Sequence, residues 1–326
     1  MVQFDPDAIG EIALKWHREG RGAVLATVVQ TWGSAPRPVG SQLAVSGAGE
    51  IAGSVSGGCV EGAVVVEALE LLENPSAKML EFGVSDEDAF AVGLACGGTI
   101  RVFLEPVGSV LSEEILGAIV SAQAVRRPVA YVVNTASGEG HVAGRDAFPD
   151  RFLRDQSGFE DDGETFVAVH NPPPRLVVVG AVHIAQNLLP MARGAGFDVT
   201  LIDPRDAFAS RSRFPDEAIS DAWPDEALNA LALDARTAVV TLTHDPKLDD
   251  PALMVALTSS AFYVGSLGSM RTHAKRVERL SKAGLTQAQI ARLHAPVGLD
   301  IKARSPGEIA VSILAEVIAV MRGAAE

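Results

Sequence analysis

The sequence predicts an α/β protein, with an N-terminal mixed α/β domain followed by a C-terminal Rossmann-like domain built on a parallel sheet. The chain has 326 residues, enough for two domains of about 150 residues that each have a hydrophobic core. Consecutive prolines at 172–174 can join neither a helix nor a central strand, so they predict a stiff connector. We therefore expect one domain at 1–170, a linker at 171–174 and a second domain at 175–326.

The first domain opens with a predicted helix. Asp5-Pro6-Asp7 supplies an N-cap residue and a proline at the first helical position, and Gly20 ends the helix. The apolar residues from 23 to 30 predict a buried strand, and the segment from 60 to 72 predicts a helix. Because one sequence does not show how the strands pair, only the mixed α/β class follows. The other expected elements are strands near 42–45 and 49–54, a strand at 99–104, a helix at 112–124, and strands at 128–134 and 165–170.

The second domain has the spacing of a Rossmann βαβ unit. An apolar strand at 175–179 runs into Gly180 and a helix, and the next strand, at 197–202, ends at Asp203. An acidic residue about 20 positions after the first glycine is placed to bind a ribose hydroxyl. The remaining expected elements are strands at 235–242 and 261–264, each followed by a helix, and a last helix capped by Ser305 and Glu308.

The dinucleotide-binding fingerprint of this unit is incomplete. Val182 occupies the place of its second glycine, whereas Ala185 at the third place is tolerated. The second glycine lets the backbone approach the pyrophosphate, and a valine side chain stands in the way. Two alternatives therefore stay open: a Rossmann domain that binds NAD(P), and one that only docks partners.

Candidate nucleotide-binding residues follow the carboxyl ends of the predicted strands. They are Gly180, Asp203, His244, Gly265 and Ser266. Ligands of open α/β sheets bind beyond these strand ends, so we expect the loops to face one crevice. His244 is a candidate acid or base, and its alternative role is a loop-stabilising hydrogen bond to the next residue, an aspartate.

Basic residues gather after the last of these loops. Arg271, Lys275 and Arg276 lie at the start of a predicted helix that follows a Gly/Ser loop. A helix N-terminus with nearby cations is suited to binding a phosphate. The alternative is a solvated helix face. In the first domain, Arg37 is flanked by two prolines, whose rigidity would preorganise its guanidinium for an anion, although a surface turn would look the same.

The chain has two cysteines, Cys59 and Cys96, and both adjoin a glycine pair. Paired glycines let the backbone bend sharply and approach a ligand closely. The helix predicted after Cys59 places this residue at a helix N-terminus, where a thiolate or another anion is favoured. The alternative is a pair of structural thiols in glycine turns. The adjoining glycines are Gly57 and Gly58 before Cys59, and Gly97 and Gly98 after Cys96.

Composition excludes several classes of protein. A formal net charge of −14 argues against a nucleic-acid surface. No apolar run is long enough to span a bilayer, and the acidic start lacks the basic region of a signal peptide. Two cysteines do not make a disulfide framework, so we expect a cytoplasmic protein with no membrane partner.

Seven segments, taken together and in order, resemble the XdhC/CoxI family, the accessory proteins of xanthine dehydrogenase and related molybdenum hydroxylases. Each segment alone is a weak signal, and their number and order make the resemblance specific over nearly the whole chain. The segments are TWGSAPRPVG at 31–40, GSVSGGCVE at 53–61, GLACGG at 93–98 with its strand to 106, PPRLVVVG at 173–180, THD at 243–245, YVGSLGS at 263–269 and LHAPVGLDI at 293–301.

The resemblance implies a cofactor chaperone and not a metabolic enzyme. Family members are understood to bind the pyranopterin molybdenum cofactor and to protect it while a cysteine desulfurase helps to install its sulfido ligand. They then deliver it to the apo-hydroxylase, and they look like homodimers. By this resemblance Cys59 and Cys96 would coordinate molybdenum or carry sulfur, in an order left open. Arg37 and the amides of the glycine pairs would contact the pterin phosphate.

Two rival functions remain open at this stage. The first is an NAD(P)-dependent oxidoreductase that uses Asp203 and His244. The second is a scaffold that bridges the desulfurase and the hydroxylase without holding the cofactor. The family commonly reads Gly-Ala-Gly-His at the first turn of its second domain, so Val182 departs from the pattern and weakens any nucleotide role. The sequence leaves the client hydroxylase open.

Overall fold

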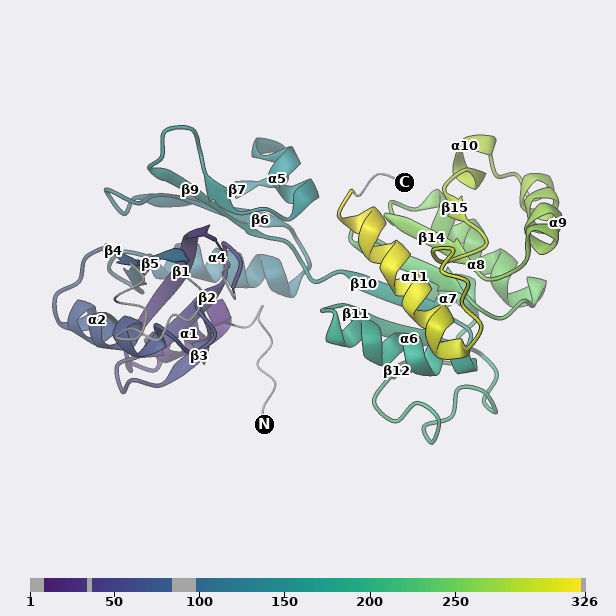
Figure 1. Cartoon of the computed structure of the whole chain (residues 1–326), viewed down its shortest axis with the longest axis horizontal. Helices are drawn as coiled ribbons and strands as arrows, with labels where there is room; N and C mark the ends of the chain where they lie inside the picture. Colours follow the sequence, from purple (N-terminus) through teal and green to yellow (C-terminus); the bar gives the residue numbers. More distant parts are fainter. Residues whose placement is uncertain (1–8, 34–36, 84–97, 324–326) are drawn as a thin grey trace. The chain divides into compact units, whose positions relative to one another are not determined.

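The computed structural model of the chain describes residues 9–33, 37–83 and 98–323 and divides into two compact units (Figure 1). The first unit is Met1–Pro172 and the second is Pro173–Glu326. Their border lies within the run of prolines. The fold class expected from the sequence is confirmed, since a mixed α/β unit with antiparallel sheets precedes a parallel-sheet unit.

The first unit has two antiparallel sheets. The five-stranded sheet has the order β3-β2-β1-β5-β4, and the four-stranded sheet has the order β7-β6-β9-β8. The elements are α1 (Ile9–Arg18), β1 (Ala23–Trp32), β2 (Gln42–Ser46), β3 (Ile51–Gly53), α2 (Glu61–Glu73), β4 (Lys78–Phe82), β5 (Thr99–Pro106), α4 (Glu113–Ala124), β6 (Val129–Asn134), β7 (Gly140–Gly144), a 3-10 turn (Arg145–Ala147), α5 (Pro149–Arg154), β8 (Gly158–Phe159) and β9 (Thr165–His170).

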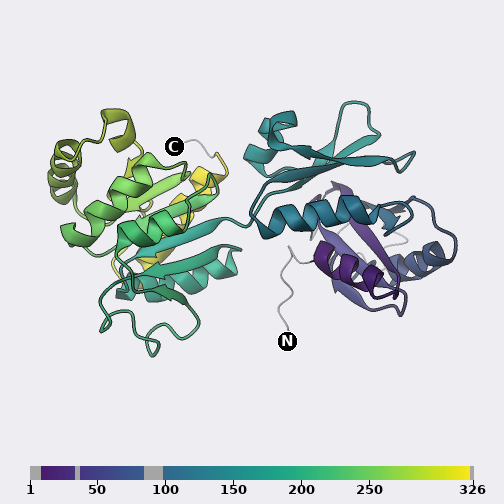
Figure 2. The ribbon, with the colours of Figure 1, turned by 180° about the vertical axis from the view of Figure 1, so that it is seen from behind.

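The five-stranded sheet has a core on each face. Alternate residues of β1 point to opposite faces, as the twofold periodicity of a strand requires. Val24, Ala26 and Val28 pack beneath α2. Leu25 and Val29 instead join the core shared with α1, α4 and the four-stranded sheet. Figure 2 shows α4 beside that second sheet. The packing fixes α2, and with it the loop that carries Cys59, over one face of the first sheet.

Some elements of the first unit differ from the sequence expectation. The strand predicted at 23–30 continues to Trp32, because Thr31 and Trp32 still pair with β5. Strands β4, β7 and β8 and helix α5 were not predicted. Most of their residues are half-buried or exposed, so they lack the apolar alternation that marks a strand with one buried face. The expected helix start at 5–7 lies outside the described residues.

The second unit contains one parallel sheet of six strands. Its order is β12-β11-β10-β13-β14-β15, which, counted from β10, is the 3-2-1-4-5-6 order of a Rossmann sheet. The elements are β10 (Arg175–Val179), α6 (His183–Gly194), β11 (Asp198–Ile202), β12 (Ala218–Ser220), α7 (Pro224–Ala230), β13 (Thr237–Thr241), α8 (Pro246–Thr258), β14 (Tyr263–Ser266), α9 (Met270–Lys282), α10 (Gln287–Ile290), β15 (Leu293–His294) and α11 (Pro306–Met321).

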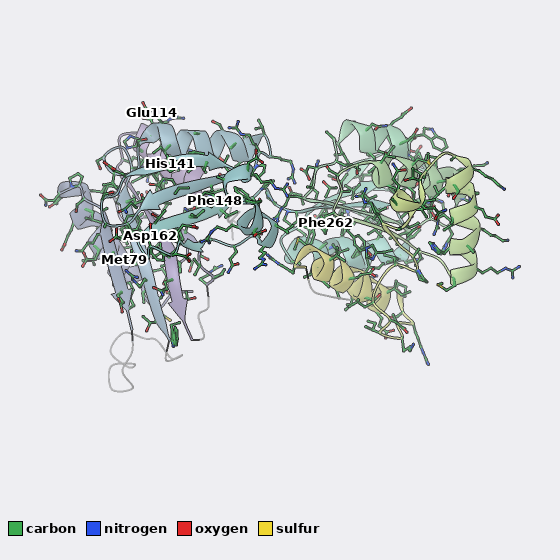
Figure 3. The ribbon with its side chains drawn as sticks, turned by 90° about the horizontal axis from the view of Figure 1, so that it is seen from above. Met79, Glu114, His141, Phe148, Asp162 and Phe262 are labelled. Carbon is green, nitrogen blue, oxygen red and sulfur yellow. The ribbon has the colours of Figure 1, made fainter. Side chains whose placement is uncertain are left out.

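Helices cover both faces of the parallel sheet. α6 and α11 lie side by side on one face, and α7 and α8 cover the other (Figures 1 and 2). Phe262, just before β14 and labelled in Figure 3, is half-buried and packs against the core under α6 and α11. Met79 of β4, also labelled there, is half-buried against the core between the sheets of the first unit. Because all six strands run the same way, the loops after β10, β13 and β14 emerge at one edge. Within the described residues, no helix is both long and apolar enough to cross a membrane.

Candidate functional site

The loop before α2 folds around the carboxylate of Glu61, the first residue of that helix. Its oxygen Oε1 accepts hydrogen bonds from the Ser54 hydroxyl at 2.7 Å, the Ser56 amide at 2.9 Å and the Gly57 amide at 3.1 Å. The other oxygen, Oε2, accepts from the Ser56 hydroxyl at 2.5 Å and the Gly58 amide at 2.9 Å. Successive amides that converge in this way form a nest for an anion. Glu61 supplies that anion from within the chain.

The charge of Glu61 is stabilised by this nest. Burial raises the pKa of the carboxyl group, but the hydrogen bonds from Ser54 and Ser56 outweigh burial and lower the pKa to about 2. Glu61 is therefore ionised at neutral pH. It provides the negative charge that a helix N-terminus favours, and it does so while only 8% exposed.

Cys59 lies on the outside of this loop. Its amide donates to the Ser56 hydroxyl at 3.0 Å, and the amide of Val60 donates to the same oxygen at 2.9 Å. The thiol is free and exposed. The backbone of Cys59 is thus held in place while its sulfur faces solvent at the start of α2, where the sequence placed it.

The glycine pair next to Cys59 serves the internal carboxylate. Gly57 and Gly58 both have positive φ, at +80° and +118°, which side-chain-bearing residues rarely adopt. The sequence predicted that their amides contact an external anion. In this structure they donate to Glu61, so an external phosphate would have to displace that carboxylate first.

The other residues expected around the cofactor are only partly described. Arg37 is exposed, and Gly98 directly precedes β5. Cys96 and Gly97 lie outside the described residues. Among the residues that are described, no three His, Cys, Asp or Glu side chains gather into a set that could hold a metal ion.

The loop after β10 packs against, and hydrogen-bonds with, residues of the neighbouring loops. Gly180 has a φ of +115°, and a Cβ atom there would lie 2.7 Å from Cγ2 of Thr243. Val182 is the N-cap residue of α6 and packs partly against the core. The amide of Ala181 donates to Asp203 at 2.8 Å. The first turn therefore makes its polar contact within the protein.

Asp203 is engaged on both oxygens. Oδ1 accepts from Nε of Arg205 at 2.8 Å, and Oδ2 accepts from Nη2 of the same arginine at 2.7 Å. Burial raises the pKa of Asp203, but the hydrogen bonds from Arg205 and Ala181 outweigh burial, so the net shift is downward. Asp203 is 1% exposed. Asp203, which the sequence predicted to bind a ribose, instead holds the loop after β11 against the turn that follows β10.

Gly265 and Ser266 are not loop residues, in contrast to the sequence expectation. Both belong to β14 and are buried. The Ser266 hydroxyl bonds with that of Thr241 at 2.5 Å. A Cβ atom on Gly265 would lie 2.6 Å from Cγ2 of Val297. Ser266 therefore joins β14 to β13, Gly265 packs against Val297, and both residues are buried in internal contacts.

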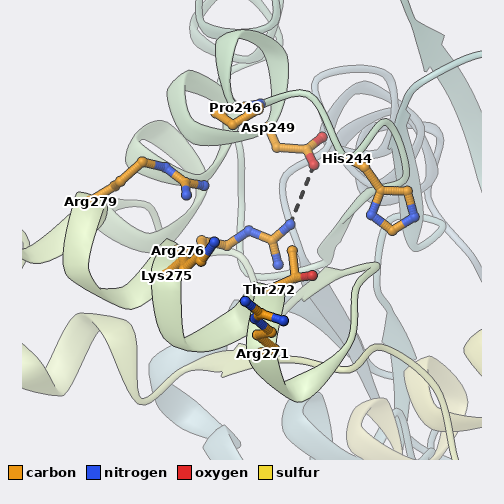
Figure 4. Close-up of a pocket in the computed structure, with 8 residues that line it drawn as sticks. All are labelled: His244, Pro246, Asp249, Arg271, Thr272, Lys275, Arg276 and Arg279. Atoms are coloured by element: carbon orange, nitrogen blue, oxygen red, sulfur yellow. Dashed lines mark hydrogen bonds and ion pairs between the residues drawn. The ribbon is translucent and has the colours of Figure 1, made fainter.

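A small pocket lies where the loops after β13 and β14 meet α8 and α9 (Figure 4). Its volume is about 140 Å³. The sequence correctly brought His244 together with the basic residues of α9, but Gly180 and Asp203 do not line this pocket. The lining residues are His244, Pro246, Asp249, Arg271, Thr272, Lys275, Arg276 and Arg279.

An ion pair is buried at the base of this pocket. Arg276 and Asp249 are each 1% exposed, with Nη2 of the arginine 3.4 Å from Oδ2 of the carboxylate. Asp249 also accepts a 2.6 Å hydrogen bond from the Thr243 hydroxyl. Burial raises the pKa of Asp249 despite these partners. Next to it, Arg279 forms a two-point pair with Asp250, at 2.5 Å and 2.9 Å.

Sequence reasoning missed Asp249 and Arg279 as parts of this pocket. A usable signal was present, because adjacent aspartates at 249–250 precede a helix with arginines three residues apart at 276 and 279. Residues three apart lie on one helix face and can pair with two neighbouring acids. Within the described residues, His244 does not make the hydrogen bond to Asp245 that was its predicted alternative role. Asp245 instead caps α8 through the Lys247 amide at 2.9 Å.

The architecture defines a class: a two-unit α/β protein with a cysteine-bearing antiparallel-sheet unit before a Rossmann unit. The model of the XdhC Rossmann domain matches residues 176–317, and that of the XdhC and CoxI family matches residues 16–83. The chain belongs to the XdhC and CoxI family. The resemblance expected from the sequence is thereby confirmed.

Two curated relatives extend over nearly the whole chain. The chain is 31% identical to the molybdenum cofactor insertion chaperone PaoD of Escherichia coli K12, over 97% of the chain and 89% of the relative. It is 30% identical to a probable xanthine dehydrogenase subunit of Bacillus subtilis 168, over 91% of the chain and 92% of the relative. A crystal structure described as a xanthine dehydrogenase from Bacillus halodurans has a TM-score of 0.72 at 25% identity, covering 97% of this chain and 96% of that one.

Proposed function

We propose that this protein binds the molybdenum cofactor and delivers it to the apo form of a xanthine dehydrogenase-type molybdenum hydroxylase. The name of the Escherichia coli relative, a molybdenum cofactor insertion chaperone, supports this role at 31% identity over 97% of the chain. The observation that carries the proposal is the exposed thiol of Cys59 on a loop whose other amides are held by Glu61.

The chemistry of a thiol suits this cargo. A thiolate is a soft ligand for a transition metal and also carries sulfur as a persulfide. A preorganised loop lowers the entropy lost when the thiol binds its cargo. Cys96 and Arg37 are proposed as the other contacts, with the pair of cysteines as molybdenum ligands. A cysteine desulfurase, the apo-hydroxylase and a second copy of the chain are the proposed partners, in the cytoplasm.

The observations do not favour the oxidoreductase alternative. An NAD(P) site would need the first turn after β10 and the carboxylate of Asp203. Both are engaged within the protein, through Ala181 and Arg205. Val182 adds a side chain at the point where a pyrophosphate must approach. We therefore propose a chaperone and no hydride transfer.

The delivery step is tested by transfer between purified proteins. The cofactor-loaded protein is mixed with an apo-hydroxylase in the absence of oxygen. The two proteins are then separated, and the molybdenum content of each is measured. We expect the hydroxylase to gain activity in proportion to the molybdenum that leaves the chaperone. The Cys59→Ser variant should bind the cofactor at least about tenfold more weakly, a loss of about 1.4 kcal/mol or more, and should deliver correspondingly less molybdenum.

A matched control is Glu73→Gln, at the exposed far end of the same helix, which should deliver as the wild type does. If molybdenum stays on the chain, delivery is refuted. If both Cys59→Ser and Cys96→Ser activate the hydroxylase fully without carrying molybdenum, the protein is a docking scaffold instead.

A further inference from the structure

We propose that the pocket at the start of α9 binds the phosphate group of a small molecule. This inference goes beyond the proposed function, because the pocket lies in the second unit and uses neither cysteine. Four basic side chains and one carboxylate line it, in a protein with a net charge of −14. Arg279 is occupied by Asp250, and Arg276 offsets Asp249. Arg271 and Lys275, both exposed, supply the excess positive charge.

The buried guanidinium of Arg276 carries the argument. Its Nη2 donates to the Leu267 carbonyl at 3.1 Å. Its Nε and Nη1 are buried and have no hydrogen-bond partner among the described residues. Figure 4 shows the guanidinium between Asp249 and Thr272, within the ring of side chains that line the pocket. Buried donors in folded proteins are nearly always satisfied, so these nitrogens call for an acceptor from outside the chain.

The backbone around Arg276 adds further donors. α9 is 13 residues long, and its N-cap residue Ser269 accepts from the Thr272 amide at 3.3 Å. The amides of Met270 and Arg271 have no partner within the helix, as at any helix start. Together with the helix dipole they favour an anion at this end. A Cβ atom on Gly268 would meet Thr272 at 3.1 Å, so the glycine keeps the loop close to the helix start.

The size of the pocket selects the kind of ligand. About 140 Å³ is below the range of roughly 300–1,000 Å³ that holds a whole small-molecule ligand. A tetrahedral oxyanion fits such a space, while the rest of a phosphate ester would extend into solvent past Arg271 and Lys275. The ligand chemistry is thus a phosphate, either free or carried as an ester.

A purely structural role for Arg276 makes a different prediction. In that case the pairs Arg276–Asp249 and Arg279–Asp250 only tie α9 to α8, and no oxyanion binds. Binding measurements separate the two roles, because changes at Arg271 and Lys275 leave both ion pairs in place.

The test is isothermal titration of the full chain at constant ionic strength with inorganic phosphate, pyrophosphate and AMP. We expect saturable binding at one site per chain. The double variant R271Q/K275Q should bind at least about tenfold more weakly, a loss of roughly 1.4 kcal/mol. Lys282→Gln, which removes one positive charge from the far end of α9, should bind as the wild type does. AMP that binds more tightly than inorganic phosphate indicates an ester, and the reverse order indicates free phosphate.

Two results would overturn the proposal. One is no saturable heat with any of the three anions up to about 10 mM. The other is equal affinity in R271Q/K275Q and the wild type. Circular dichroism of the double variant guards against misfolding as the cause of lost binding. Because the experiment measures phosphate binding, its outcome is independent of the proposed function. A protein that carries no molybdenum can still bind phosphate, and a protein that carries the cofactor can still lack this phosphate site.

Discussion

Glu61 determines the shape of the loop that presents Cys59. One carboxylate accepts hydrogen bonds from two hydroxyls and from the amides of both glycines. Without the carboxylate, several hydrogen-bond donors of this loop would converge on a point that has no acceptor. The glycines beside the cysteine are therefore explained by an internal anion.

Replacing Glu61 tests this role. Glu61→Gln keeps the size of the side chain but turns one oxygen into a donor that faces other donors. We expect the free energy of unfolding at pH 7 to fall by about 2–4 kcal/mol, as measured by urea unfolding. Because the pKa of Glu61 is lowered to about 2, its contribution is present above pH 4.5 and is lost as the pH falls toward 2. Equal stability of this variant and the Glu73→Gln control would contradict the account.

The contribution of Glu105 to stability should depend on pH in the opposite direction. It is buried on β5 and accepts a 2.6 Å hydrogen bond from the Tyr131 hydroxyl, and burial raises its pKa to about 7. Between pH 4.5 and 7 the folded state then binds a proton that the unfolded state releases. Stability contributed by Glu105 is therefore full below pH 4.5 and is lost as the pH rises through 7.

The Glu105→Gln variant should lack this pH dependence. Between about pH 5 and pH 8 the wild type should lose up to about 3 kcal/mol more of its unfolding free energy than the variant loses. Urea unfolding at several pH values in this range measures the difference. Parallel pH profiles for the two proteins would show that Glu105 does not titrate as described.

At the scale of elements, the turn after β10 depends on Gly180. The residue has positive φ, and Thr243 from the loop after β13 fills the space where a Cβ atom would stand. The hydroxyl of Thr243 is held by Asp249, so the side chain cannot turn away without losing that bond. The two loops at the switch point of the sheet are thus packed directly against each other.

Gly180→Ala should cost more than the backbone conformation alone explains. Gly196 offers a matched control, because its φ is also positive and a Cβ atom there meets nothing within 4 Å. We expect a loss of about 1–2 kcal/mol for Gly196→Ala, and a loss about 1–3 kcal/mol larger for Gly180→Ala. Adding Thr243→Ser removes the clashing methyl group and should restore part of the difference in thermal unfolding. No restoration would contradict the contact.

Most buried elements could be predicted from the sequence, and elements with little burial could not. The largely apolar strands β9 and β10 lie at 165–170 and 175–179, as expected, and the capping box of Ser305 and Glu308 starts α11. β4 was missed because none of its residues is fully buried. The end of β14 was missed because Gly265 and Ser266 look like loop residues, although Gly265 has no room for a Cβ atom beside Val297 and the Ser266 hydroxyl bonds with Thr241.

For the whole molecule, the fold class followed from the pattern of strands and helices and the family from seven short segments, but the side-chain partners did not. The sequence placed Cys59 correctly at the start of a helix. It could not show that Glu61 occupies the glycine amides or that Arg205 occupies Asp203, because both contacts depend on loop conformation. Burial of Arg276 was equally hidden, since a basic helix face is usually solvated.

The cofactor content of the purified chain shows whether the protein holds the molybdenum cofactor, as we propose. Wild type, Cys59→Ala and Cys96→Ala are purified without oxygen from a molybdate-fed host, and molybdenum and oxidised pterin are measured per chain. We expect near-stoichiometric cofactor in the wild type and its loss when a cysteine is replaced. A wild-type chain without molybdenum, from a host whose own molybdoenzymes are loaded, would contradict it.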